Sequence, residues 1–352
     1  NSIRAFELMG HLPFALPGTR KRAVVIAFGA GIALGAVGSH PEVERVDCVE
    51  ICPPVVEATR FFRRFNNDVL ADSRVHVYVE DGRTFIAAAR GKFDLIVLDA
   101  THPTAGDSWA LYTREFYQEC LAHLAATGAV VQWLPTHGLD PIDYFTAVRT
   151  FISVFPNSSL WHSDTHTVLL ATRGEQVLDW ERIRDMFALP TPKRLLALAD
   201  IRDAYELIAC YLGGPNDLRR LAGKGPLNRE DLAPLQFGER RSSLDATTPL
   251  NLTLLARRFP RLPRIERLPQ GGEGQEVRSR LGQHLRSEMW VVKGAALGTT
   301  GEWERALLFF QRARLLNPAS RDAVRWLDLA RKALEKKPGS ERASVGAPRL
   351  SR

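Results

Sequence analysis

The chain has few cysteines and no long apolar run, and both shortages limit what it can be. Its 352 residues include 4 cysteines, none in a Cys-x-x-Cys pair, and no cysteine–histidine cluster has the spacing of a zinc site. We therefore expect free thiols, a reducing and hence cytoplasmic compartment, and no bound metal. No stretch reaches about eighteen apolar residues and no signal peptide is visible, so no membrane-spanning helix is expected.

Basic stretches interleaved with aromatic residues are also missing, although the chain is basic overall. Lysine and arginine number 47 against 40 acidic residues, for a net charge of +7. Much of the excess lies in the C-terminal half, as at Arg257, Arg258 and Lys336. A solvated basic surface is the favoured interpretation and an anionic membrane face comes second, whereas nucleic acid is not an expected partner.

Apolar runs that alternate with helical patterns are what the chain does contain. Continuous or alternating runs predict strands at residues 23–28, 46–49, 75–79, 93–98, 129–133 and 167–171. Helical patterns between them lie at residues 54–65, 113–125 and 141–155. Such alternation predicts an α/β fold, namely a Rossmann-like doubly wound sheet with a late antiparallel strand, followed by an all-α C-terminal region.

The pattern changes near residue 180, where proline- and glycine-rich breaks begin to separate helices, with a linker expected at 260–275. The predicted organisation is a lead-in at 1–20, a Rossmann-like nucleoside-binding catalytic domain at 21–180, a helical extension and linker at 181–275, a tetratricopeptide-like unit at 280–336 and a disordered tail at 337–352. The repeat pattern includes Trp290, Gly294 and Phe310. A single repeat cannot bury its own apolar face, so we expect it to pack on the main domain or to contact another protein.

Glycines and a carboxylate follow the first two predicted strands. Gly29 and Gly31 come directly after the first strand, where they let the backbone turn tightly and approach a ligand. Glu50 ends the second strand, at the place where a carboxylate can accept hydrogen bonds from ribose hydroxyls. The alternatives are close strand–helix packing for the glycines and a solvent-facing glutamate.

Two more acids follow the third and fourth predicted strands. Asp81 with Gly82 can receive an adenine amino group, or can form a simple turn, and Asp99 lies at the centre of the sheet edge beside whatever reacts, or caps a helix. A dinucleotide enzyme needs only the first two features. The four together favour one adenosine with a reactive arm, as in S-adenosylmethionine or its decarboxylated form.

These segments together resemble the spermidine synthase family of aminopropyltransferases, and most closely its bacterial members fused to a membrane transporter-like domain. The resemblance covers roughly residues 1–240. Its motifs lie at residues 11–13, 24–31, 50, 79–85, 94–99, 111–117, 132–135 and 227–231. It implies that the chain is the cytoplasmic portion of a membrane-tethered protein, and that a homodimer is expected.

The resemblance also implies aminopropyl transfer from decarboxylated S-adenosylmethionine to a small amine, without a metal. Asp99 would orient the amine and take its proton. Glu50 would hold the ribose, Asp81 with Gly82 the adenine, and the two loop glycines the reactive arm. The amine pocket would contain Gln132, Tyr112 and His102.

Two positions depart from the family's pattern, and they motivate two alternatives. Ile32 stands where the family has an acid in its glycine loop, and His102 stands where it has a second acid after the fourth strand. A methyltransferase that uses S-adenosylmethionine is the first alternative. The second is a catalytically silent nucleoside-binding or scaffold module, which the tetratricopeptide-like unit also favours.

Overall fold

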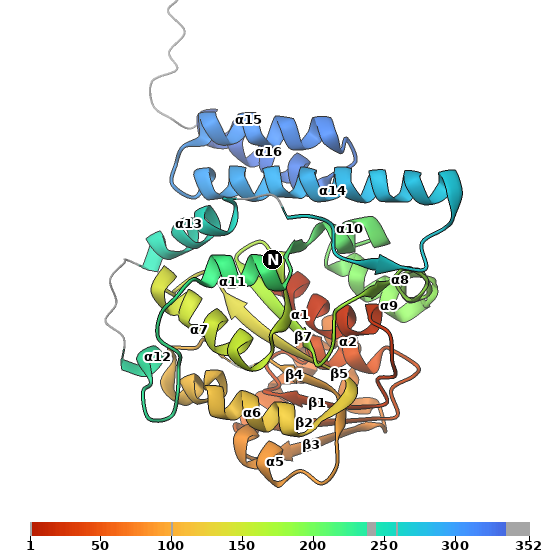
Figure 1. The fold of residues 1–352 in the computed structure, drawn as a ribbon, viewed down its shortest axis with the longest axis vertical. Helices are drawn as coiled ribbons and strands as arrows, with labels where there is room; N and C mark the ends of the chain where they lie inside the picture. Colours follow the sequence, from red (N-terminus) through yellow and green to blue (C-terminus); the bar gives the residue numbers. More distant parts are fainter. Residues whose placement is uncertain (1, 100, 238–243, 258–259, 336–352) are drawn as a thin grey trace, which may run out of the picture.

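The computed structural model describes residues 2–99, 101–237, 244–257 and 260–335, and its centre is an eight-stranded sheet (Figure 1). The strand order is β3-β2-β1-β4-β5-β7-β6-β9. The strands are β1 (Arg22–Ile26), β2 (Arg45–Glu50), β3 (Val75–Val79), β4 (Phe93–Leu98), β5 (Leu124–Pro135), β6 (Asn157–Ser163), β7 (His166–Thr172) and β9 (Tyr211–Gly213). From β3 to β5 the neighbours run parallel, which confirms the doubly wound sheet.

The central strands β1 and β4 are mostly apolar because helices cover both faces of the sheet (Figure 1). In β1, Val25 joins the cluster that contains α1 and α2, whereas Val24 joins the opposite cluster, which contains α6 and α7. The helices are α1 (Ser2–His11), α2 (Ile32–Gly38), α5 (Gly82–Ala88), α6 (Arg114–Ala122) and α7 (Pro141–Val154). Alternating side chains of one strand thus fill two cores.

The late antiparallel strand is confirmed, but it does not stand alone. β7 pairs antiparallel with β5 on one side and with β6 on the other, and β6 in turn pairs with β9. Neither β6 nor β9 was predicted, since serines and a histidine interrupt the apolar run of β6 and β9 has three residues. Because β9 lies at residues 211–213, the sheet continues past the boundary predicted at 180.

The first residues form a buried helix, which corrects the expectation of a lead-in. α1 packs against α2, and a Cβ placed on Gly10 would lie 2.3 Å from the Cβ of Ala36. Glu7 and His11 are fully buried on α1, with 3.1 Å between Oε2 of Glu7 and Nε2 of His11. Nδ1 of His11 in turn lies 2.8 Å from Nε2 of His40, which is also buried. The N-terminal segment is therefore part of the core.

A close approach at Gly35 provides a test of how α2 packs. A Cβ there would lie 2.2 Å from the carbonyl oxygen of Asn66. Replacing Gly35 with alanine is expected to lower the free energy of unfolding by about 1–3 kcal/mol, because backbone must move. Gly174→Ala, at an exposed position with nothing within 4 Å, is the control and is expected to stay within about 0.5 kcal/mol. Urea denaturation measures both, and an unchanged midpoint for G35A would contradict this packing.

The segment after β2 is not the single helix predicted at 54–65. It breaks into α3 (Pro53–Ala58), a 3-10 turn η2 (Thr59–Phe62) and α4 (Arg63–Asn66). The side-chain amide of Asn66 donates to the carbonyl oxygens of Ala30 and Thr59, at 2.9 and 3.1 Å. These two hydrogen bonds hold the segment against the loop after β1. A continuous helix would run away from that loop.

Helices dominate the chain after residue 180, as predicted. They are α8 (Trp180–Ala188), α9 (Pro190–Leu198), α10 (Ala204–Ala209), α11 (Pro215–Ala222), α12 (Pro234–Phe237), α13 (Leu244–Leu255), α14 (Gly271–Gly298), α15 (Trp303–Leu316) and α16 (Arg321–Glu335). The linker expected at 260–275 is shorter: β10 (Ile265–Glu266) pairs with β8 (Leu178–Asp179), and α14 begins at Gly271. The tail predicted at 337–352 lies outside the described residues.

The last three helices lie across the α/β part of the molecule (Figure 1). Gly294 of α14 lets α15 approach closely, since a Cβ there would lie 2.3 Å from the ring of Phe310. Arg4 of α1 pairs with Asp322 of α16 at 2.5 Å, and Arg325 of α16 pairs with Asp164 at 2.6 Å. The helical unit therefore packs on the main domain, while its tetratricopeptide character stays a prediction.

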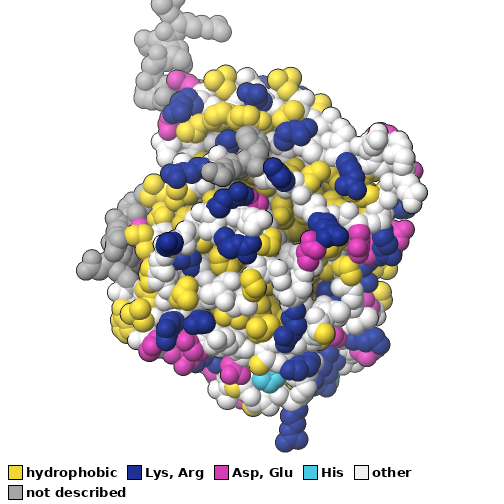
Figure 2. Space-filling view, in the orientation of Figure 1, with side chains coloured by type: hydrophobic (Ala, Val, Ile, Leu, Met, Phe, Trp, Pro, Cys, Tyr) yellow, Lys and Arg dark blue, Asp and Glu magenta, His cyan; other side chains and the backbone are white. Residues whose placement is uncertain are grey.

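The face of the molecule drawn in Figure 2 carries charged side chains of both signs. Figure 2 shows lysine and arginine side chains scattered among acidic and apolar ones on the face drawn, without a basic stripe. In the part of the chain that the structure describes, no helix combines the length and apolarity needed to cross a bilayer.

Candidate functional site

The carboxyl ends of β1 and β4 meet where the strand order reverses, which is where open α/β sheets bind ligands. A cavity of ≈ 160 Å³ opens at this place. Its described lining residues are Phe6, Gly29, Ala30, Ile32, Asp99, Thr101 and Trp133. The structure thus brings together the predicted Gly29 and Asp99, 70 positions apart, in one hollow.

The loop after β1 has the backbone shape for which its glycines were singled out. Gly29 and Gly31 have φ angles of +50° and +73°, in the left-handed region that favours glycine. Ala27 also has φ +68°, although it carries a Cβ. Strain of this kind clusters at functional sites, and the sequence had no signal for it. A Cβ at Gly29 would lie 3.9 Å from Oδ2 of Asp99, so the loop and this carboxylate are neighbours.

Glu50 ends β2 and is held in place by main-chain donors. Its Oε2 accepts from the N–H of Phe28 at 2.8 Å, and its Oε1 accepts from the N–H of Cys52 at 2.9 Å. The side chain is buried, so these bonds fix the carboxylate beside the loop after β1. Each oxygen keeps a further lone pair for a hydroxyl donor.

Asp99 follows β4, and its main-chain N–H donates to the carbonyl oxygen of Ile26 at 3.0 Å. Burial raises the pKa of the Asp99 carboxyl well above its usual range, and the negative charge of Glu50 adds to the increase. A carboxyl group with a raised pKa can hold a proton that a reacting amine releases. This is the chemical property expected of the predicted catalytic acid–base residue.

Asp81 and Gly82 lie at the start of α5, after β3. Oδ1 of Asp81 accepts from the N–H and the hydroxyl of Thr84, at 2.9 and 3.0 Å, and so caps the helix. Gly82 is needed for packing, because a Cβ there would lie 2.4 Å from Cγ2 of Ile26. The alternative interpretation of Asp81 was a simple turn, and the structure shows a helix cap at this place. A contact of Asp81 with adenine stays a prediction.

Gln132 and Tyr112 are not among the described residues that line the cavity. Both are fully buried. The Gln132 amide donates to the carbonyl oxygen of Trp133 at 3.0 Å and accepts from the Tyr117 hydroxyl at 3.1 Å. The Tyr112 hydroxyl donates to the same carbonyl at 3.1 Å, and burial, followed by the charge of Asp99, raises its pKa well above the usual range. These side chains brace the end of β5.

His102 is also absent from the described lining of the cavity. Its Nε2 lies 3.0 Å from the carbonyl oxygen of His137, and its Nδ1 lies 3.0 Å from the Thr104 hydroxyl. The ring thus ties the loop after β4 to the loop after β5. The three side chains predicted to surround the amine therefore do not line the cavity in the described structure. They form hydrogen bonds to the main chain near it; the three are Gln132, Tyr112 and His102.

Phe6, Ile32 and Trp133 form the apolar part of the lining, and no binding role was predicted for them. Phe6 comes from α1, whose apolar spacing at Ala5, Leu8 and Met9 indicates a helix but not where it packs. Ile32 is the first residue of α2, and Trp133 lies on β5. Among the described residues, no group of three or more histidines, cysteines or acids could hold a metal ion.

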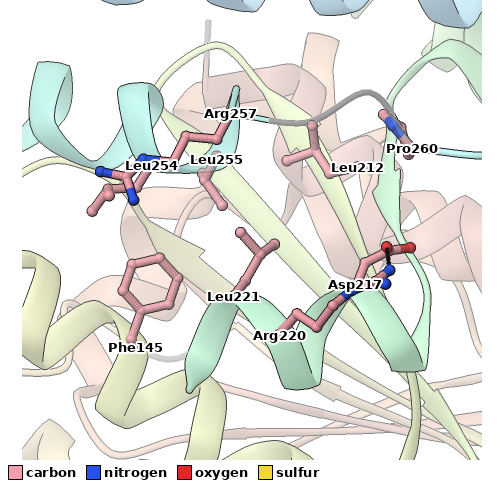
Figure 3. A pocket seen from close by; sticks show the side chains of 9 residues that line it. All are labelled: Phe145, Leu212, Asp217, Arg220, Leu221, Leu254, Leu255, Arg257 and Pro260. Carbon is pink, nitrogen blue, oxygen red and sulfur yellow. Dashed lines mark hydrogen bonds and ion pairs between the residues drawn. The ribbon is translucent and has the colours of Figure 1, made fainter. Parts of the chain in front are cut away.

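A further hollow of ≈ 230 Å³ contains none of the predicted site residues (Figure 3). Phe145 of α7, Leu221 of α11 and Leu254 of α13 point into it, and Arg220 on its rim is paired with Asp217 at 2.5 Å. We therefore place the candidate site at the strand ends.

The strand order and the loops at the carboxyl ends of β1, β2 and β4 define the class of protein as a Rossmann-like α/β fold. Comparison with known proteins narrows this class. Residues 4–136 match the family model described as the spermine/spermidine synthase domain. The resemblance drawn from the motifs is confirmed over this stretch, while the transporter fusion and the tetratricopeptide-like unit stay predictions.

Curated relatives agree with this match. The chain is 32% identical over 150 residues to the polyamine aminopropyltransferase of Thermotoga maritima, covering 43% of this chain and 51% of the relative. It is 35% identical over 145 residues to that of Pseudomonas syringae, covering 41% and 49%. The chain thus spans about half the length of the curated relatives it matches. The crystal structure of spermidine synthase from Thermotoga maritima aligns with a TM-score of 0.46 and 27% identity, over 52% of this chain and 65% of that one.

Proposed function

We propose that the chain is a spermidine-synthase-like transferase that moves an aminopropyl group from decarboxylated S-adenosylmethionine to an amine. The observation that carries the proposal is the position of Asp99, a carboxyl of raised pKa in a cavity directly beside the glycine loop after β1. The family match over residues 4–136 supports the same reaction class.

The reaction needs an ordered amine more than it needs an added activator. The amine lone pair forms a bond to the aminopropyl carbon next to the sulfonium, the carbon–sulfur bond breaks, and its electron pair goes to sulfur, which leaves as neutral methylthioadenosine. Bond formation gives a secondary ammonium, which releases one proton to the Asp99 carboxylate and becomes the secondary amine product. Holding the two reactants in line contributes the rest of the acceleration.

The donor would lie along the carboxyl ends of β1, β2 and β3. Glu50 would accept hydrogen bonds from the ribose hydroxyls, because both its oxygens are already oriented by main-chain donors. Asp81 would accept from the adenine amino group through the oxygen that does not cap α5, and the Gly29–Gly31 turn would let the reactive arm approach the main chain.

Product analysis tests the proposal. We expect methylthioadenosine to accumulate when the protein is incubated with decarboxylated S-adenosylmethionine and a panel of amines. Calorimetry with both donor forms is expected to show tighter binding of the decarboxylated one. Adenosylhomocysteine formed from S-adenosylmethionine would instead indicate a methyltransferase. Tight donor binding without any product would indicate a silent module.

A further inference from the structure

We infer that the acceptor is a small monoamine with an apolar body, and not a dicationic polyamine; this rests on the function proposed above. The cavity beside the glycine loop is lined by a single charged side chain, Asp99, among its described residues. One ammonium group can pair with it. A second ammonium group on the same molecule would have to be buried or left without a carboxylate.

The other acids of the region have different partners. Both oxygens of Glu50 accept main-chain N–H groups, and Glu50 is not part of the described lining. Asp81 caps α5 and lines a separate hollow with Glu115 and Glu119. Asp107, the next acid after Asp99, is exposed. None of these carboxylates is therefore in place to receive the far end of a diamine.

The walls of the cavity suit hydrocarbon. Phe6 and Ile32 contribute side chains without polar atoms, and Ile32 is only 6% exposed. Trp133 is largely buried, and its Nε1 is buried without a hydrogen-bond partner in the described structure, so its ring is what lines the open space. Each methylene buried here increases affinity roughly 4-fold. An ammonium group in the same place loses its hydrating water, which lowers affinity.

The size of the cavity fits a short acceptor. Its ≈ 160 Å³ is below the roughly 300–1,000 Å³ of a site for a drug-sized ligand. Thr101 supplies a hydroxyl at the exposed rim, and an aromatic ring next to the single carboxylate favours one cation. The acceptor class is therefore a short alkyl or arylalkyl amine.

Two acceptors of equal length provide the test. Pentylamine and 1,4-diaminobutane differ in that a terminal methyl replaces an ammonium. With decarboxylated S-adenosylmethionine, we expect kcat/KM for methylthioadenosine release to favour pentylamine by about 10-fold or more, in line with the cost of one unpaired buried polar group. Equal or greater activity with the diamine would overturn the inference while leaving aminopropyl transfer intact.

A substitution at Ile32 sharpens the comparison. Ile32→Asp places a second carboxylate in the lining and is expected to shift the preference toward the diamine by about 10-fold. Ile32→Asn, of the same size and without charge, is the matched control and should not produce this shift. Thermal unfolding of both variants establishes that they fold. If the ratio of kcat/KM for pentylamine to kcat/KM for the diamine is the same in I32D as in the unaltered protein, the result would count against the inference.

Binding distinguishes failure of the inference from failure of the proposed function. Protein saturated with methylthioadenosine is titrated with each amine in a calorimeter, a measurement that needs no turnover. Tighter binding of pentylamine than of the diamine supports the inference. If no product then forms with any acceptor, the proposed transferase activity is refuted but the inference about the pocket is not. Equal binding, tighter diamine binding or no binding of either amine would overturn the inference.

Discussion

Replacing Asp99 with asparagine is expected to lower kcat for aminopropyl transfer by about 10²- to 10⁴-fold, the range typical of a lost general base. Asparagine keeps the shape of the side chain and cannot take the proton of the amine. Glu50 and the glycine loop are unaltered, so the dissociation constant of the donor should change little. Initial rates of methylthioadenosine release and calorimetry with the donor measure the two quantities separately.

The pH profile identifies this role more specifically than the rate does. Asp99 works as the carboxylate, and burial together with the charge of Glu50 raises its pKa. Activity of the unaltered protein should therefore fall as the pH decreases through this raised pKa, and that fall should be absent in D99N. Asp107→Asn, the same change on an exposed residue of the same loop region, is the control. A D99N variant with normal kcat would remove Asp99 from the mechanism.

Replacing Arg4 with methionine is expected to lower the free energy of unfolding by about 3 kcal/mol, at the lower end of the range for a broken buried ion pair. Arg4 is 4% exposed, donates to the carbonyl oxygen of Ala199 at 2.9 Å and pairs with Asp322 at 2.5 Å. Glu288 lies in the same hollow, where burial, followed by the charge of Asp322, raises its pKa to about 8. The loss is limited because Arg325 also reaches Asp322, at 3.0 Å.

Two comparisons separate this ion pair from general effects of the substitution. Arg305→Met removes an exposed arginine paired with Glu302 on the helical unit, and is expected to cost less than about 1 kcal/mol. The double variant R4M/D322L leaves no uncompensated carboxylate at this position and should be more stable than R4M alone. Chemical denaturation measures all three. An R4M variant as stable as the unaltered protein would show that α16 does not depend on α1.

Much of the sheet and of the donor side of the site could be predicted from the sequence. Strands buried on both faces are continuous apolar runs, so β1, β2 and β4 were recognisable. Since parallel strands end at one edge, Gly29, Glu50 and Asp99 could be assigned to that edge from their places after those strands. β6 could not, because serines and a histidine interrupt its apolar run, and β9 could not, because it has three residues and pairs with a strand about 50 positions earlier in the chain.

The acceptor side of the site was decided by tertiary structure. Gln132, Tyr112 and His102 lie near the strand ends by sequence, yet hydrogen bonds to main-chain carbonyls direct their polar groups to supporting contacts. Phe6 reaches the cavity only because α1 packs on α2 and the sheet, and a buried ion pair joins that helix to α16.

The sequence by itself therefore determined the order of strands β1 to β5 and β7, the glycine turn and the acids that follow or end the strands. These depend on local backbone preferences and on the alternation of apolar residues. Only the tertiary structure decided which side chains face the cavity and that, among the described residues, a single carboxylate lines it, because rotamers and long-range packing set the direction of a side chain.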